Sequence, residues 1–389
     1  MKNRKNHHSL LTLGILCGTT GCALAGAAEI STAATTKPEA DAFDKIWSYA
    51  TLYKDSSNPY LQELKFTGRL QADWYGVDAD EGSDEDLVSR RARFGFKAKI
   101  FEDFTAHAEM EANISRHSSF YSRLTDVYVS WEPSKTFKVT LGKQSIPYTY
   151  DGWTSSKELI SVDRSMIGNN IWFPQEYIPG LAVSGKEGQW LYRAGVFTNG
   201  TASQEFGDFD ATWIGSLGIG YDFAKSIDAD KAVVRFDYVY QDPTNISAND
   251  LFTRAHEHIF SLNGEIQQGA FGLAADVAST RGFATQSDLF GLMIMPSYYL
   301  IEDKLQAVLR YTYMSSDDSR GIRLNRYENQ VVFGRGNEYN EVFAGLNYYI
   351  YGHKLKLQGG VQYANMEDDT NRGGDYNGWQ GILGLRISW

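Results

Sequence analysis

The sequence predicts an all-β fold, a 16-stranded antiparallel transmembrane β-barrel with an inward-folded third loop. Three observations favour this fold class. Apolar and polar residues alternate through most of the chain after residue 65, and short connections alternate with long ones. In addition, the 389 residues contain no run of 18 or more apolar residues, which excludes a membrane protein built of helices.

Residues 1–28 are predicted to be a secretory signal peptide. Basic residues at the start are followed by a short apolar stretch at 10–16 and by small residues at 23–27, the order that a signal peptide shows. Both cysteines of the chain, Cys17 and Cys22, lie in this segment. The exported chain is therefore expected to have no disulfide, and it is more acidic than the whole chain, whose formal net charge is −11.

Residues 29–64 are predicted to be a periplasmic N-terminal extension. Phe43, Ile46 and Trp47 recur at helical spacing, which indicates a short amphipathic helix at about 41–54. A frayed tail is the alternative interpretation of this segment.

Residues 65–389 are predicted to form the barrel. Within 91–100, Phe94 and Phe96 lie on one face and Arg91 and Arg93 on the other, because side chains alternate with period 2 along a strand. The predicted strands are 65–75, 91–100, 103–113, 123–132, 136–145, 179–187, 189–199, 211–223, 231–241, 256–267, 269–279, 289–301, 304–314, 340–350, 353–364 and 378–389.

The connections support a membrane barrel over a soluble β-sandwich, the main alternative fold. Short turns at one rim and long loops at the other are typical of outer-membrane barrels. The first long loop is expected at 76–90 and the third at 146–178. A connection as long as the third usually has a function, and it would narrow the pore by folding into the barrel.

The polar faces of the strands are expected to line the lumen. The cations placed there are Arg69, Arg91, Arg93, Lys97, Lys99, Lys138, Arg193, Arg235, Arg310, Lys354, Lys356 and Arg386. The four cations within 91–99 would repel one another unless an anion or an acid neutralises them. Arg90 has the opposite parity and is expected at the rim, whereas Lys157 and Arg164 belong to the third loop and would lie at the constriction.

Several short motifs occur in a fixed order along the chain. They are GRLQ at 68–71, RRARFG at 90–95, FEDF at 101–104, LGKQ at 141–144, KEL at 157–159, DRS at 163–165 and GVFTNG at 195–200. In these motifs the sequence resembles the phosphate-selective porin O and P family, most densely over 65–200. The resemblance implies a trimeric, anion-selective porin with an arginine ladder along its lumen. The ladder candidates carried over are Arg69, Arg90, Arg91 and Arg93, and the loop candidates are Lys157 and Arg164.

The predicted function is passive diffusion of small inorganic anions, with phosphate as the candidate substrate, through the outer membrane of a Gram-negative-type bacterium. The expected partners are these anions, outer-membrane lipid and two further copies of the chain in a homotrimer; no nucleic acid, cofactor or metal is expected. Lumen acids such as Glu109 and Glu111 leave open a general diffusion porin without phosphate preference.

A structural or adhesive barrel and a barrel enzyme are two less favoured functions for such a fold. No arrangement of Ser, His and Asp typical of an enzyme is evident, and His256 and His258 alone are too few to ligate a metal.

Overall fold

The computed structural model describes residues 42–114, 119–172, 177–198, 206, 213–244, 254–319 and 321–389. The predicted signal peptide and residues 29–41 of the predicted extension lie outside this part of the chain. No helix among the described residues has the length and apolar character needed to span a membrane.

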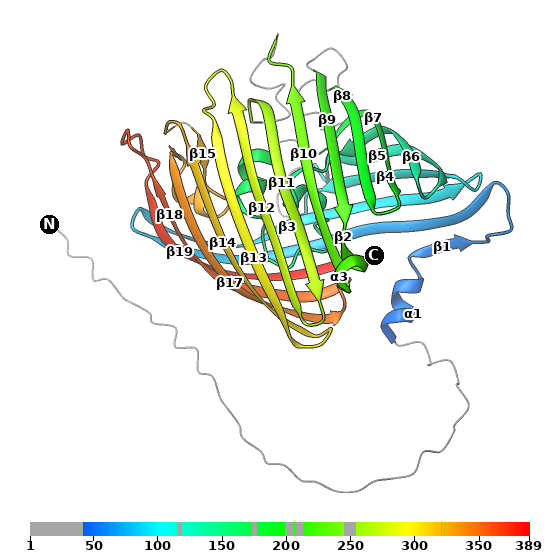
Figure 1. Cartoon of the computed structure of the whole chain (residues 1–389). Helices are drawn as coiled ribbons and strands as arrows, with labels where there is room; N and C mark the ends of the chain where they lie inside the picture. Colours follow the sequence, from blue (N-terminus) through cyan, green and yellow to red (C-terminus); the bar gives the residue numbers. More distant parts are fainter. Residues whose placement is uncertain are drawn as a thin grey trace, which may run out of the picture. The chain divides into compact units, whose positions relative to one another are not determined.

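The chain forms a closed 16-stranded antiparallel β-barrel (Figure 1), which confirms the predicted barrel and its number of strands. Each strand pairs with the next one along the chain, and the last pairs with the first. The strands are β2 (Leu61–Ala79), β3 (Gly82–Ile100), β4 (Phe104–Ala112), β5 (Tyr121–Ser134), β6 (Phe137–Ser145), β7 (Tyr177–Glu187), β8 (Trp190–Thr198), β9 (Trp213–Asp222), β10 (Lys231–Gln241), β11 (His256–Gln268), β12 (Phe271–Gly282), β13 (Leu289–Ile301), β14 (Leu305–Ser316), β17 (Glu338–Tyr351), β18 (Leu355–Glu367) and β19 (Tyr376–Ser388).

The alternation of side chains gives the wall an apolar outer face and a polar inner face. In β2, Trp74 is 43% exposed, whereas the adjacent Asp73 is 0% exposed. Leu383 and Leu385 in β19 are exposed, and Arg386 is buried. An apolar exterior around a charged interior is the arrangement of a barrel that lies in lipid and encloses water.

The predicted first loop at 76–90 is wrong, because strands β2 and β3 continue through most of it. Only Asp80 and Glu81 separate the two strands, and Glu85 pairs with Gly76 in the extended ladder. Strand pairing depends on the backbone ladder, so acidic side chains that reach solvent do not end a strand. The barrel also begins at Leu61, before the predicted boundary at residue 65.

The segment before the barrel holds helix α1 (Ala42–Ser48) and strand β1 (Thr51–Lys54), which pairs with β2. The indole nitrogen of Trp47 donates to the carbonyl oxygen of Ser388 at 2.6 Å, and its ring lies 5.1 Å from that of Tyr351. These contacts attach α1 to β19 and β17, beside the seam where the last barrel strand meets the first.

The segment 146–172, between β6 and β7, carries helix α2 (Thr149–Trp153) and a π-helix, η1 (Gly168–Trp172). It contacts inward-facing side chains of strands from several parts of the barrel. Trp153 donates to Asp237 of β10 at 3.0 Å, and Tyr150 donates through its backbone to Asp276 of β12 at 2.7 Å. From other strands, the segment accepts hydrogen bonds from Arg69 of β2, Arg310 of β14, Asn347 of β17, Lys356 of β18 and Arg386 of β19.

A second segment, 321–336, also contacts the inner wall and is called the inner hairpin below. Its short strands β15 (Ile322–Arg323) and β16 (Arg335–Gly336) pair with each other, and a 3-10 turn, η2 (Glu328–Gln330), lies between them. The Tyr327 hydroxyl donates to Asp73 of β2 at 2.6 Å, and the Tyr339 hydroxyl of β17 donates to Glu328 at 3.2 Å.

The two inner segments pack together and form much of the apolar core. Met166, Ile167 and Ile171 belong to one buried cluster with Ile322 and Leu324, and none of the five is more than 3% exposed. The same cluster includes wall residues such as Met293, Met314 and Ile382, so the core lies between the inner segments and the barrel wall. Side chains on these segments are positioned by packing as firmly as those on the wall.

Candidate functional site

A β-bulge in strand β3 brings two consecutive arginines to one cavity. Gln71 pairs with Arg91 and Ala72 pairs with Ser89, so Arg90 is the extra residue of the bulge. Arg90 and Arg91 both line the same cavity. The expectation from parity that Arg90 lies at the rim is therefore wrong, because a bulge interrupts the alternation of side chains.

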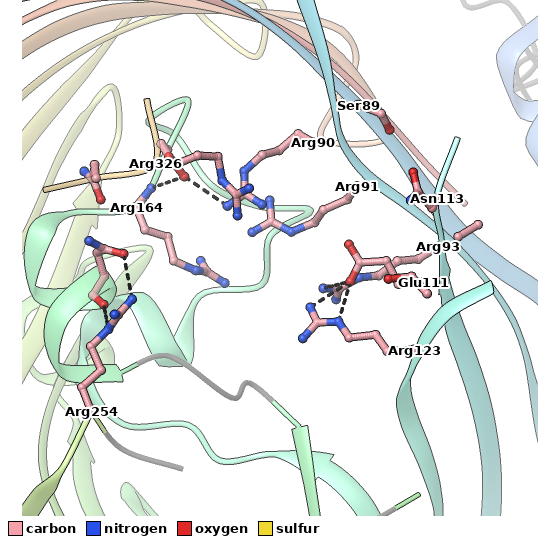
Figure 2. Close-up of a pocket in the computed structure, with 15 residues that line it drawn as sticks. Ser89, Arg90, Arg91, Arg93, Glu111, Asn113, Arg123, Arg164, Arg254 and Arg326 are labelled. Atoms are coloured by element: carbon pink, nitrogen blue, oxygen red, sulfur yellow. Dashed lines mark hydrogen bonds and ion pairs between the residues drawn. The ribbon is translucent and has the colours of Figure 1, made fainter. Parts of the chain in front are cut away.

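This cavity, the arginine cavity, has a volume of about 470 Å³. Figure 2 shows its arginines approaching from the barrel wall on one side and from inner segments and loops on the other. The cationic lining residues are Arg90, Arg91, Arg93, Arg123, Arg164, Arg254 and Arg326. The carboxylates in the lining are Glu111 and Asp163, so the cavity has a strong excess of positive charge.

Few acids are available to hold the seven guanidinium groups. Glu111 accepts from Arg93 at 3.2 Å and from Arg123 at 2.8 Å, so one carboxylate serves two arginines. Asp163 accepts from Arg90 at 3.4 Å. Like charges at such separations disfavour one another unless counter-charge is present, and a small anion in the cavity would supply it.

Two of the cavity arginines contact backbone carbonyl groups, and one of the two also contacts an aromatic ring. Arg164 lies with its guanidinium carbon 4.7 Å from the ring centroid of Trp172 and donates to the carbonyl oxygen of Thr154 at 3.1 Å. Arg254 donates through Nε to the carbonyl oxygen of Asn169 at 2.9 Å. Both contacts orient a guanidinium without cancelling its charge.

Asp163, an acid of the third loop, is ionised at neutral pH. Burial alone would raise the pKa of Asp163, but the neighbouring Arg90, Arg326 and Arg91 outweigh burial and lower it to about 2. Asp163 therefore contributes a permanent negative charge, which lies beside three arginines and limits how strongly they attract an anion.

Three arginines of the cavity are absent from the sequence-based candidates. Arg123 shares parity with the outward-facing Val129, but the pairing of β4 with β5 shifts between Ala108 and Met110 and turns Arg123 inward. Arg254 and Arg326 belong to connections between strands. Long connections show no alternation of apolar and polar residues that would indicate their path. The positions of Arg254 and Arg326 could therefore not be predicted from the sequence.

Arg69 and Arg310, predicted to line the lumen, point into the barrel and are bound there to acids and to the segment 146–172. Arg69 donates to Ser156 at 2.6 Å and to Glu109 at 3.2 Å. Arg310 donates to Glu341 at 2.7 Å and to the carbonyl oxygen of Asp163 at 2.8 Å. Both side chains are buried and lie outside the lining of the arginine cavity.

The remaining candidates are spread along the barrel and do not join the arginine cavity. Arg193 donates to Gln144 at 3.0 Å, and Arg235 donates to Glu265 at 3.4 Å. Lys97 and Lys99 are exposed towards the end of β3 that leads into a short turn. The described structure therefore brings together Arg90, Arg91, Arg93 and Arg164 of the predicted set, and separates the others from them.

The pKa of Lys157 lies slightly above neutral pH, and it predicts how the anion preference of the channel depends on pH. Its Nζ donates to the main-chain oxygen of Trp389 at 3.0 Å, and burial, reinforced by Arg69, lowers its pKa to about 8. Its charge is therefore complete below pH 7 and is lost as the pH rises through 8. We expect a preference for anions to weaken between about pH 7 and pH 9.

The reversal potential of the channel in a KCl gradient, measured across this pH range, checks this expectation. Lys157→Arg keeps its charge at high pH and should remove the Lys157 part of the pH dependence. Equal pH profiles for the wild type and Lys157→Arg would show that Lys157 does not influence permeation.

A closed antiparallel barrel with an apolar exterior and a charged interior is the architecture of outer-membrane porins. Residues 64–246 match the model of the family described as phosphate-selective porin O and P, which confirms the family resemblance. The match covers β2 to β10 and includes the strands and the third loop that supply Arg90, Arg91, Arg93, Arg123 and Arg164.

Solved porins share the fold at low sequence identity. The anion-selective porin from Comamonas acidovorans is 13% identical with a TM-score of 0.56, and the match covers 84% of this chain and 99% of that one. OprB of Pseudomonas putida is 12% identical with a TM-score of 0.57, covering 84% and 94%. OmpF of Salmonella typhi is 13% identical with a TM-score of 0.58, covering 87% and 100%.

Among curated sequences, an uncharacterized protein of Aquifex aeolicus (strain VF5) is 22% identical over 360 residues. That match covers 77% of this chain and 81% of the Aquifex protein.

Proposed function

We propose that this outer-membrane porin lets small inorganic anions diffuse passively through its barrel, with phosphate among them. The arginine cavity is the observation that carries the proposal, because seven guanidinium groups face two carboxylates there. A guanidinium donates paired hydrogen bonds to the oxygens of phosphate-type anions and stays charged at any physiological pH.

The proposed mechanism is movement of the anion between neighbouring shallow sites. A pair of unit charges at 4 Å contributes about 4 kcal/mol at an effective dielectric constant of about 20, so one isolated deep site would hold the anion. Arg90 and Arg326 lie close enough to influence each other. Asp163 interacts with both of them and with Arg91, and its negative charge makes each of these sites shallower. Several weak sites in series allow the ion to enter and to leave.

A general diffusion porin without phosphate preference is the second candidate. The carboxylates of Glu111 and Asp163 occupy part of the donor capacity that phosphate would use. This observation favours permeation of many small anions over tight selection of one.

A planar bilayer measurement distinguishes a porin that binds phosphate from a general diffusion porin. In a KCl gradient, the reversal potential of the purified protein should show chloride to be more permeant than potassium. Added phosphate should then reduce the chloride current if phosphate occupies the arginine cavity, and should leave it unchanged in a general diffusion porin. A cation preference in the wild type would contradict the whole proposal.

We also propose that residues 1–28 direct export, that the segment 146–172 narrows the pore and that the chain forms a homotrimer. Contacts of this segment with β2, β10 and β12 support the constriction. The fold and the family favour a channel over an enzyme. Among the described residues, no group of three or more His, Cys, Asp or Glu residues is arranged to hold a metal ion.

A further inference from the structure

A second cavity lies on the side of the barrel with the short turns. Its volume is about 1040 Å³, and residues of the turns before β10, between β11 and β12 and between β13 and β14 line it. Five carboxylates face it, and the cations in its lining are Lys231 and Arg235. The carboxylates are those of Glu158, Asp230, Glu265, Glu302 and Asp303. We call this space the acidic vestibule.

The carboxylates of the vestibule outnumber the cations of its lining, and most of them are exposed to solvent. Glu265 accepts from Lys231 at 2.8 Å and from Arg235 at 3.4 Å, so these two cations are already shared with one carboxylate. Glu158, Glu302 and Asp303 are exposed to solvent. The vestibule therefore has a negative field that concentrates cations and repels anions.

One segment separates the acidic vestibule from the arginine cavity. Trp153, Thr154 and Glu158 line the vestibule, whereas Asp163 and Arg164, a few residues further along, line the arginine cavity. Across this segment Arg164 donates to the carbonyl oxygen of Thr154 at 3.1 Å. Zones of opposite charge thus lie next to each other along the barrel, on the two sides of this segment.

We infer that the acidic vestibule makes conduction asymmetric, so that the channel passes more current when the short-turn end is at positive potential. This inference rests on the proposed anion-conducting function. At that polarity, anions arrive from the arginine cavity and cations from the vestibule, and each zone supplies the ion that it concentrates. At the opposite polarity, both ions leave the boundary between the zones, and the depleted boundary limits the current.

Neutralising three exposed acids tests the inference. In Glu158→Gln, Glu302→Gln, Asp303→Asn the remaining acids of the lining, Asp230 and Glu265, balance Lys231 and Arg235. Asp303 has a φ of 54°, a left-handed conformation that asparagine adopts readily. The backbone should therefore accept all three changes.

The measurement is the current–voltage curve of single channels in about 0.1 M KCl, where screening is weak. At about 100 mV of either sign, we expect the wild-type currents to differ about twofold, and the ratio to fall close to one in the variant. Anion preference should rise in the variant at the same time. The substitution Asp317→Cys, labelled with biotin and detected with streptavidin, identifies the long-loop side of each channel.

A matched control carries the same charge change at the same rim. Glu132, Glu187 and Asp228 lie in or beside short turns and do not line the vestibule, and Asp228 has the same φ of 54° as Asp303. Glu132→Gln, Glu187→Gln, Asp228→Asn should keep the wild-type ratio. A symmetric curve in an anion-selective wild type, or equal effects of both triple variants, would overturn the inference. A wild type without anion preference would instead refute the proposed function.

Discussion

The variant Arg91→Glu, Arg123→Glu, Arg326→Glu is expected to convert the anion preference of the channel into a cation preference. The three changes leave four arginines and five carboxylates in a cavity that now has seven and two. The field at the cavity therefore changes sign, and an entering anion meets repulsion where it now finds guanidinium donors. The measurement is the sign of the reversal potential in a KCl gradient.

Two controls make this result interpretable. Lysine at the same three positions keeps the charge and should keep the anion preference, although the paired hydrogen bonds of arginine to phosphate are lost. Heat-dependent migration in gel electrophoresis reports whether each variant forms the barrel. A folded glutamate variant with unchanged anion preference would show that ions take another path.

Removal of the inner hairpin is expected to raise single-channel conductance severalfold. The hairpin contacts β2 through Tyr327, β17 and β18 through Glu328, and the segment 146–172 through Arg323. It therefore occupies space that the wall would otherwise leave to water and ions. The backbone nitrogen of Ser316 donates to the carbonyl oxygen of Asn337 at 2.8 Å, so a short Gly-Ser linker can replace residues 321–336.

The point variant Arg326→Gln is the control for the deletion. It removes the charge that the hairpin brings to the arginine cavity but keeps the bulk, so it should lower anion preference without a large rise in conductance. Conductance of the deletion variant equal to that of the wild type would show that the hairpin does not restrict the ion path.

The strands could be predicted from the sequence because one physical rule governs them. Lipid favours apolar side chains on the outside of the barrel, and the lumen accepts polar ones. Apolar and polar residues therefore alternate visibly along segments such as 91–100. The rule failed at 76–90, where acidic side chains at the end of a long hairpin resembled a loop. Hydrophobicity cannot distinguish a solvated strand from a solvated loop.

The candidate site could be predicted only in part, because bulges and long connections complete it. Arg91 and Arg93 follow the alternation, and family motifs indicated Arg90 and Arg164 in addition. The inward position of Arg123 depends on a register shift between β4 and β5, and no local sequence pattern predicts this shift. Arg326 and Arg254 reach the cavity through the packing of connections, and this packing depends on contacts between residues far apart in the chain.

The central claim is that anions pass the arginine cavity more readily than cations do, and a cysteine at Ser122 tests it most directly. Ser122 lines the cavity and is uncharged, so Ser122→Cys leaves the seven arginines in place. The measurement compares the rates at which an anionic and a cationic thiosulfonate reagent of similar size modify this cysteine through the open channel. The account predicts that the anionic reagent reacts at least about tenfold faster. Equal rates, or a faster cationic reagent, would contradict it.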